Sequence, residues 1–366
     1  MRTITVNLDS RRYDIVIETG SFFKLGLSIE QVLKTKTIGI VSDTTVWSLY
    51  GSQLTEIFNK QGFKTSTFLI QPGESSKTIN EVIRLCREFI QAGLDRGTAI
   101  IAFGGGVVGD IAGFAAALFL RGVDFVQVPT TLLADCDSSV GGKVGVNLDG
   151  AKNLIGTFYQ PKQVIIDPVV LKTLPQRELI AGLAETIKTG LIRDPELYQI
   201  IFDHLGEIQT VSSLDIISDC IYRSISVKSE IISRDEKESG LRRILNFGHT
   251  VGHSLEGVLG SNIILHGEAV LLGMFTAIEI SYAKNILHKA DYKRIYNDLL
   301  RLPVSVDITF ISYKQLASYI KKDKKMADGR LNFVVLESIG NAYCSQEVTE
   351  GDIEQAFKSI QQHFHQ

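Results

Sequence analysis

The chain has 366 residues, enough for two domains of ordinary size, and its 44% hydrophobic and 22% charged residues are typical of a globular protein. A formal net charge of -3 argues against a general affinity for nucleic acid or for a membrane surface. The four cysteines form no CxxC pair, and no apolar run is long enough for a signal peptide or a membrane span. We therefore expect a cytoplasmic protein without a cysteine metal site.

The first half of the chain alternates strand and helix signals. The N-terminal 20 residues alternate in polarity like a pair of strands. Short apolar runs at 38–41, 65–70, 99–103 and 125–128 predict four further strands, and the spacing at 81–92 predicts a helix. This alternation predicts a parallel sheet covered by helices.

The second half changes to helical periodicity, at 177–192, 214–233, 250–259 and 268–287. Pro161, Pro168 and Pro175 are typical of a linker at the change. We predict an α/β nucleotide-binding domain with a parallel sheet over residues 1–168 and an all-α domain over residues 169–366. The cleft between them is the natural place for a site.

A glycine turn follows the strand predicted at 99–103. Gly104, Gly106 and Gly109 form a GxGxxG pattern between that strand and a helix rich in small residues. Such a turn lets a pyrophosphate approach the N–H groups at a helix start, so the pattern favours a nucleotide site over a mere packing turn. The acid that usually binds the ribose is missing from the next strand end. Asp43 and the turn at 72–77 are candidates, although Asp43 fits equally well as a helix N-cap.

Three of the seven histidines lie close together in the sequence, which indicates a metal site. His249 and His253 are four residues apart, on one face if helical, and His266 follows. Glu185, a charge within an apolar helix, is a plausible further ligand. The alternative is a hydrogen-bonded pair of helix histidines without a metal.

Several basic residues stand alone among apolar or glycine residues. They are Arg121, Lys143, Lys152 and Lys188, and Lys228 and Arg242 lie on predicted helices near His249. Each alone fits a surface or salt-bridged residue. Together they indicate a pocket for a multiply charged anion, because an unpaired buried charge is costly.

These blocks, in this order, closely resemble the dehydroquinate synthase family. The resemblance covers nearly the whole chain. It is most specific in GGGVVGDIAGFAAALFLRGVDFVQVPTTLLA, DSSVGGKVGVNLDGAKNLIGTFYQP, LKTLPQRELIAGLAETIK, GLRRILNFGHTVGHSLE and LHGEAV. It implies a nucleotide-binding α/β domain joined to a helical domain. The implied reaction converts 3-deoxy-D-arabino-heptulosonate 7-phosphate into 3-dehydroquinate and phosphate, with catalytic NAD, a divalent metal (zinc or cobalt) and a homodimeric enzyme.

The resemblance also implies roles for individual residues. The metal ligands would be Glu185, His249 and His266, which moves His253 from the ligand set suggested by spacing to the substrate side. The NAD site would be lined by Asp43, Glu74, Lys77, Gly105, Gly106, Val107, Asp110, Thr130, Thr131, Leu133, Lys152 and Thr173. The substrate would be held by Asp137, Lys143, Asn153, Lys188, Lys228, Arg242, Asn246, His253 and one of Lys324 and Lys325, with Arg121 reaching the phosphate from a partner subunit.

The chain departs from the common family pattern near the cofactor residues, with Val144 after Gly-Gly-Lys, Asp135-Cys136 before Asp137, and Thr189 after Lys188. Two related activities are alternatives: another sugar phosphate cyclase, and a metal-dependent polyol or glycerol-phosphate dehydrogenase. Lys143, Arg242 and Asn246 favour the carboxylated substrate over the first alternative, and the DSSVGGK and LNFGHT blocks argue against the second.

Overall fold

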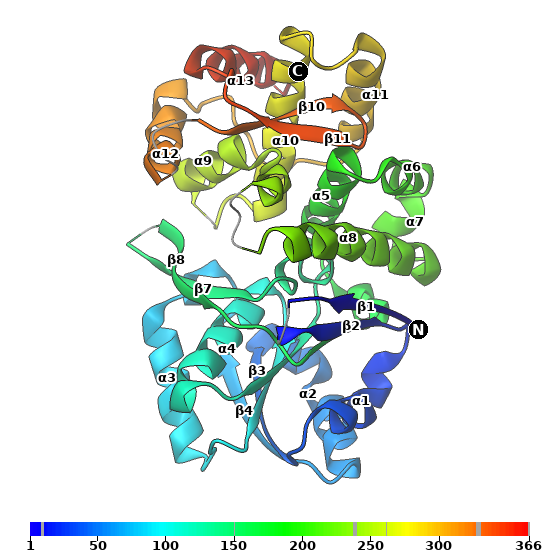
Figure 1. Ribbon diagram of the computed structural model, residues 1–366, viewed down its shortest axis with the longest axis vertical. Coiled ribbons are helices and arrows are strands. Elements are labelled where there is room, and N and C mark those ends of the chain that lie inside the picture. Colours follow the sequence, from blue (N-terminus) through cyan, green and yellow to red (C-terminus); the bar gives the residue numbers. More distant parts are fainter. Residues whose placement is uncertain (9–10, 150, 237–239, 261, 327–330, 365–366) are drawn as a thin grey trace. The chain divides into compact units, whose positions relative to one another are not determined.

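The computed structural model describes residues 1–8, 11–149, 151–236, 240–260, 262–326 and 331–364, with side chains described except at 322–326 (Figure 1). The chain divides into two compact units. The first comprises residues 1–175 together with 211–233, and the second comprises 176–210 together with 234–366. Within the described residues, no helix has both the length and the apolar character needed to cross a membrane.

The first unit is built on a seven-stranded sheet with the order β1-β2-β9-β6-β5-β3-β4. The strands are β1 (Arg2–Val6), β2 (Tyr13–Ile17), β3 (Thr37–Asp43), β4 (Lys64–Ile70), β5 (Ala99–Gly104), β6 (Asp124–Pro129) and β9 (Gln163–Ile166). β1 and β2 are antiparallel, and the remaining pairs are parallel. Each of the four apolar runs predicted as strands lies within one of these strands, so the predicted parallel α/β fold is confirmed.

Helices cover both faces of this sheet. Helices α1 (Leu25–Val32) and α2 (Thr44–Lys60) pack on one face, and α3 (Ile79–Gln91) and α4 (Gly106–Leu118) pack on the other. Successive residues of β5 therefore enter opposite cores: Ile100 lies in the core under α3 and α4, and Ile101 in the core under α1 and α2. Burial on both faces explains why these strands are continuous apolar runs.

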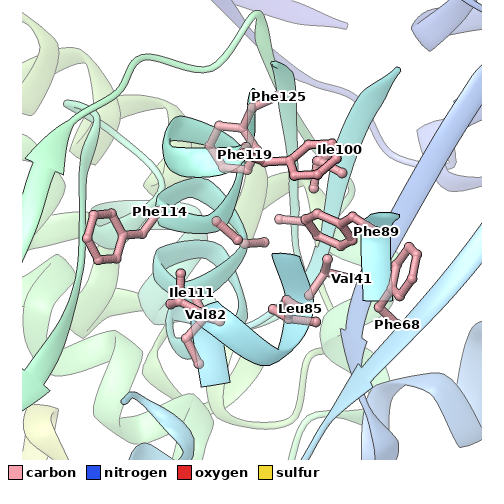
Figure 2. Close-up of a cluster of buried hydrophobic side chains, with 14 of the residues drawn as sticks. Val41, Phe68, Val82, Leu85, Phe89, Ile100, Ile111, Phe114, Phe119 and Phe125 are labelled. Atoms are coloured by element: carbon pink, nitrogen blue, oxygen red, sulfur yellow. The ribbon is translucent and has the colours of Figure 1, made fainter. Parts of the chain in front are cut away.

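The core under α3 and α4 depends on aromatic contacts (Figure 2). Val82, Leu85 and Phe89 follow helical spacing along α3 and point to the sheet. The Phe89 ring packs edge-on against Phe68 of β4, with centroids 4.7 Å apart, and against Phe119, with centroids 5.3 Å apart. This packing fixes the end of α4 relative to the sheet.

The remainder of the first unit is made up of short helices, a hairpin and one long helix. It consists of η2 (Ser21–Lys24), η3 (Glu74–Ser76), η4 (Phe119–Arg121), the π-helical turn η5 (Ala134–Ser138), the antiparallel hairpin β7 (Lys143–Leu148) and β8 (Ala151–Phe158), η6 (Pro168–Thr173) and helix α8 (Leu214–Arg234). A division at residue 168 would place α8 in the second domain, whereas its residues through 233 pack in the first unit. The assignment of NAD to residues 1–168 and of metal and substrate to 169–366 stays a prediction.

The second unit is helical, as predicted, and also contains a β-hairpin. Its elements are α5 (Gln176–Ile192), α6 (Pro195–Asp203), α7 (Leu205–Gln209), η7 (Leu241–Asn246), α9 (His249–Leu259), α10 (His266–Ala283), α11 (Lys289–Leu299), α12 (Tyr313–Met326), β10 (Phe333–Ser338), β11 (Asn341–Ser345) and α13 (Glu350–Phe364). Helix α10 is buried along most of its length, and α5, α9, α11 and α13 pack around it. It is the centre of this unit's core.

A buried acid in the first unit is unlike the rest of its core. Asp135, in η5, is fully buried, and neither of its carboxyl oxygens makes a hydrogen bond within the described residues. Burial, together with the charge of Asp167, raises the pKa of Asp135 well above its usual value. The side chain of Asp167 accepts hydrogen bonds from the N–H groups of Gly20, Phe22 and Val169.

Asp135→Asn is expected to stabilise the protein, and the gain should grow with pH. A raised folded-state pKa means that the contribution of Asp135 is fully present below its unfolded pKa of about 3.9 and is lost as the pH rises toward the folded value. At about pH 8 we expect a gain of roughly 1–2 kcal/mol, and at about pH 4 almost none. Chemical unfolding of both proteins at the two pH values measures this, and a gain that did not change with pH would contradict it.

Candidate active site

The glycine turn joins β5 to α4 in the first unit. Gly105 precedes the helix, and no side chain caps the first N–H groups of α4. A Cβ on Gly106 would lie 2.7 Å from Ser138 Oγ, so glycine is needed for η5 to approach this turn. A Cβ on Gly113 would meet Val144 and Phe125. The turn therefore combines uncapped N–H groups with the close packing that the sequence pattern predicts.

The predicted NAD residues gather where parallel strands end. Asp43 ends β3, Gly105 follows β5, and Thr130 and Thr131 follow β6. Carboxyl ends of parallel strands share one edge of a sheet, which is the usual ligand-binding edge of such folds. Asp43 Oδ1 accepts from the N–H groups of Thr45 and Val46, so it caps α2, as the alternative interpretation required. Thr130 Oγ1 is buried without a hydrogen bond in the described part of the chain.

The turn at 72–77 is tied to helix α4 and to the β7–β8 hairpin. The buried Lys77 ammonium lies 2.5 Å from Asp110 Oδ2 and 2.5 Å from Asn153 Oδ1. Asn147 donates its side-chain amide to Glu74 Oε1 at 2.8 Å and its backbone N–H to Lys77 O at 2.8 Å. Asn153 has a φ of 54°, and its backbone N–H donates to Asn147 Oδ1. Residues predicted for cofactor and for substrate thus form one hydrogen-bonded network.

The other predicted NAD residues surround this edge less tightly. Val107 lies in the first turn of α4 and packs against the aromatic core. Leu133 immediately precedes η5, and Lys152 is exposed on β8. Thr173, at the end of η6, lies 2.7 Å from the Tyr50 hydroxyl and donates to Val170 O. Their roles toward NAD stay predictions.

A lysine of α8 holds the π-helical turn η5. Lys228 is mostly buried, and its ammonium lies 2.7 Å from Asp137 Oδ1 and 2.5 Å from Asp137 O. One turn earlier on the same helix, Ser224 Oγ donates to Cys136 O at 3.4 Å. Lys143 is exposed at the start of β7, after two glycines with positive φ. Asp137, Lys228 and Lys143, three of the predicted substrate residues, therefore lie in the first unit.

Arg121 lies in a strained turn at the end of α4. Leu120, Arg121 and Gly122 have successive φ values of 50°, 69° and 116°, in the left-handed region that non-glycine residues avoid. The turn leaves Arg121 exposed on the first unit. Backbone strain of this kind persists only where the surrounding packing enforces it, here the burial of Phe119.

In the second unit, two glycines bring three helices close together. A Cβ on Gly267 would overlap the carbonyl of Ala181 on α5, and a Cβ on Gly273 would overlap the carbonyl of Gly248 before α9. Helix α10 can therefore lie directly against both neighbours. This close packing places His266, the first residue of α10, beside Glu185 of α5 and His249 of α9.

Two imidazoles face one carboxylate oxygen. Nε2 of His249 lies 3.5 Å from Glu185 Oε1, and Nε2 of His266 lies 3.4 Å from the same oxygen. Glu185 Oε1 makes no hydrogen bond within the described chain, although the side chain is fully buried. Bonds of about 2.1 Å in a tetrahedral metal site separate neighbouring ligand atoms by about 3.4 Å. The donor set and its spacing therefore fit a divalent metal.

His253 remains close enough to join this cluster. Ligand atoms of His249, His253 and His266 all lie within 4.8 Å of one another. His253 is exposed, whereas Glu185 is buried and carries a charge that a cation would neutralise. The structure thus brings together His253, the ligand suggested by spacing, and Glu185, the ligand implied by the resemblance, with His249 and His266. Glu185 is the better third ligand because it is buried and negatively charged.

The charged groups of the cluster shift one another's pKa values. Lys188 lies one turn after Glu185 on α5, with its ammonium 2.5 Å from Glu185 Oε2, and both side chains are buried. Burial would raise the pKa of Glu185, but Lys188 and the two imidazoles hold it well below its usual range. Burial and the charge of Lys188 lower the pKa of His249 to about 3, so His249 is neutral, as a metal ligand must be.

The other predicted substrate residues of this unit lie before α9. Arg242 is buried in η7; its backbone N–H donates to Asp235 Oδ2, and its guanidinium donates to Glu236 O at 2.5 Å. Asn246 ends η7 and is half-buried. Lys324 and Lys325 belong to α12, in the part whose side chains lie outside the described residues.

Three residues near the cluster were not singled out in the sequence. Glu256 of α9 accepts from His266 Nδ1 at 3.2 Å. Arg177 donates two hydrogen bonds, of 2.8 and 2.7 Å, to the carboxylate of Glu268, which also accepts from the N–H of Leu265. Glu256 and Glu268 are buried; Glu256 is the last residue of GHTVGHSLE and Glu268 lies within LHGEAV, and their place in these two motifs is the signal that could have found them.

Solved structures with the same fold are sugar cyclases and dehydrogenases. A 2-epi-5-epi-valiolone synthase from Streptomyces hygroscopicus subsp. jinggangensis 5008, with NAD+ and Zn2+ bound, is 29% identical, with a TM-score of 0.89 over 98% of this chain and 99% of that one. A 2-deoxy-scyllo-inosose synthase complexed with carbaglucose-6-phosphate, NAD+ and Co2+ is 28% identical, with a TM-score of 0.86 and the same coverage. A glycerol dehydrogenase from Schizosaccharomyces pombe shares the fold alone, at 16% identity over 96% of this chain and 89% of that one, with a TM-score of 0.68. Fold and site thus define the class of sugar phosphate cyclases.

Sequence comparison narrows the class to one family. The family model for the 3-dehydroquinate synthase N-terminal region matches residues 67–181, and the model for the C-terminal region matches 182–326. A 3-dehydroquinate synthase from Thermoanaerobacter pseudethanolicus is 42% identical over 98% of this chain and 100% of its own length. One from Microcystis aeruginosa is 41% identical over 94% and 95%. The chain belongs to the 3-dehydroquinate synthase family.

Proposed function

We propose that the chain converts 3-deoxy-D-arabino-heptulosonate 7-phosphate into 3-dehydroquinate and phosphate, with NAD and a divalent metal ion as cofactors. The observation that carries the proposal is the cluster of the buried Glu185 with the partly buried His249 and His266, whose spacing fits a metal, in a chain of this family. When bound, NAD would accept a hydride from the substrate and later return it, while the metal would polarise the substrate hydroxyl that is oxidised.

The chain's part in holding the metal is to supply three ligands from α5, α9 and α10, one of them a fully buried carboxylate. Glu185 Oε1 and the Nε2 atoms of His249 and His266 would bind it. Lys188 orients Glu185 through its other oxygen, Oε2. Because the carboxylate is fully buried, little water competes for it, and its charge acts at low dielectric.

The chain's part in holding NAD is carried by the sheet edge. The N–H groups at Gly105 and Gly106, which no side chain of the described residues caps, would bind the pyrophosphate of NAD. The turn that contains Glu74 and Lys77 would bind other polar groups of the dinucleotide. Lys77 also fixes Asp110 at the helix that receives the pyrophosphate. The full proposed set is Asp43, Glu74, Lys77, Gly105, Gly106, Val107, Asp110, Thr130, Thr131, Leu133, Lys152 and Thr173.

The proposed substrate contacts are mostly cationic, in a chain of net charge -3. They are Lys143, Lys188, Lys228, Arg242, Asp137, Asn153, Asn246, His253 and Lys324. Their charges would bind the carboxylate and phosphate and thereby orient the carbon chain, which is the chief contribution expected of the protein. The exposed, strained Arg121 would reach the phosphate bound by the other subunit of a homodimer. We place this enzyme in the cytoplasm, without nucleic acid or membrane as a partner.

Product should form without a matching rise in NADH. Purified protein with the heptulosonate phosphate and substoichiometric NAD is expected to release phosphate and dehydroquinate through many turnovers, because the hydride taken from the substrate is returned to it. Phosphate release and absorbance of NADH, followed together, measure this. One NADH released per product would instead favour a dehydrogenase, whose fold this chain shares.

A further inference from the structure

We propose that Glu256 is a positioning residue for the metal site: it fixes the ring of His266 so that its Nε2 atom faces the metal position. The inference rests on the proposed function, since it concerns the same metal. Glu256 belongs to α9, the helix that also carries His249 and His253, at spacings of seven and three residues. Helical geometry places residues with these spacings on one face.

The contact itself shows which ring nitrogen of His266 faces the acid. Glu256 Oε1 lies 3.2 Å from His266 Nδ1, and Glu256 is 3% exposed. A carboxylate can only accept there, so Nδ1 carries the hydrogen. Nε2 is then the ring atom available to a metal, and it is the atom that faces Glu185 Oε1 at 3.4 Å. The ring is thus held at one nitrogen by an acid and presented to the cluster with the other.

The ring of His249 is also bonded at Nδ1, but its partner is a neutral group. Its Nδ1 lies 3.1 Å from Phe247 O, a backbone carbonyl, and its Nε2 faces the same Glu185 oxygen. The two imidazoles therefore receive different partners. A carboxylate makes the imidazole that donates to it a stronger electron donor than a carbonyl does. His266 becomes the more basic of the two ligands, and this asymmetry depends on Glu256.

The charge of Glu256 also affects the net charge around the metal position. Within the described residues around the cluster, Lys188 pairs with Glu185 and brings one positive charge next to the metal position. Glu256 brings one negative charge on the opposite ligand, beyond His266. A divalent cation in this low-dielectric pocket is favoured by each added negative charge. Glu256 would thus act on metal affinity both through orientation and through charge.

Metal binding by two variants separates these contributions. Glu256→Ala removes the hydrogen bond and the charge, whereas Glu256→Gln keeps an acceptor oxygen and removes the charge alone. Ser254→Ala is the matched control, because Ser254 is buried on the same helix and donates only to Thr250 O of that helix. Metal-free preparations of all four proteins are titrated with Zn2+ and with Co2+ against a chelator of known affinity. The absorption bands of bound Co2+ are recorded, and thermal unfolding checks the fold.

We expect Glu256→Ala to bind both ions about 10- to 100-fold more weakly, with shifted Co2+ bands, and Glu256→Gln to lose affinity to a smaller extent. Ser254→Ala should match the wild type. Unchanged affinity and spectrum in Glu256→Gln and Glu256→Ala would overturn the inference; if Glu256→Ala does not fold, an unchanged Glu256→Gln overturns it alone. A wild-type protein that bound neither ion would overturn the proposed metal-dependent function and this inference with it.

Discussion

Glu185→Gln is expected to remove the metal ion and the activity together. The amide keeps the size of the side chain but cannot supply the negative charge that a divalent cation requires, and it leaves Lys188 as a buried cation without its anion. Loss of a direct ligand should exceed the 10- to 100-fold weakening typical of outer-shell substitutions, so we expect more than about 100-fold in metal affinity. Metal content after dialysis and phosphate release by the same sample measure the two effects.

Two further variants make this result specific. His249→Ala removes an imidazole instead of the acid, and should produce the same joint loss if both residues bind one ion. Glu178→Gln is the control, because Glu178 lies two turns earlier on α5 and outside the cluster. It should keep its metal and its turnover. A folded Glu185→Gln protein that contained no metal yet turned over at the wild-type rate would refute the metal assignment.

Local features of the sequence predicted the strands of the sheet and the turn between β5 and α4. The continuous apolar runs of β3 and β5 arise because both faces of each strand are buried, so their positions could be read directly. The signal for the turn at Gly104–Gly106 is likewise local, because the strand, the tight turn and the helix follow each other directly in the sequence. The β10–β11 hairpin was not predicted, since a short pair of strands against α10 leaves no pattern that differs from a loop.

Features that depend on distant contacts were not accessible in the same way. Lys228 and Asp137 are 91 residues apart, and nothing local in α8 indicates that its cation holds η5. Glu256 left a weak signal, because it lies seven residues after His249 on the same helical face. An acid in an amphipathic helix is usually solvated, and the packing of α10 on α9 is what buries Glu256.

The roles proposed for individual residues rest on the family resemblance and on chemistry. The structure brings Glu185, His249 and His266 together, and it joins Lys77, Asp110 and Asn153 in one network. These groupings support the proposed division of labour between a cofactor edge and a metal cluster. They also give the division a testable form, because residues of the two groups should affect different binding constants.

Arg242→Ala and Lys143→Ala are expected to reduce turnover strongly while leaving NAD affinity nearly unchanged. Each would remove a charge-assisted contact to the carboxylate or phosphate of the substrate, and such contacts are among the stronger ones in proteins. A desolvated contact of this kind is worth roughly 2–5 kcal/mol, which corresponds to a loss of about 30- to several-thousand-fold in kcat/KM. Steady-state kinetics and a direct NAD titration of each variant separate the two effects.

Lys77→Ala should show the reverse pattern, with weaker NAD binding and a smaller change in substrate affinity. Its ammonium holds Asp110 in the helix that follows the glycine turn, so its loss would leave the half-buried Asp110 carboxylate without this cation. Because Lys77 also contacts Asn153, some loss of turnover is expected, but less than for Arg242→Ala. Lys162→Ala is the control: its exposed pair with Asp124 is worth little, so neither constant should change. Equal loss of NAD affinity in the Arg242, Lys143 and Lys77 variants, or normal turnover in both Arg242→Ala and Lys143→Ala, would show that the cofactor and anion contacts are not divided as proposed.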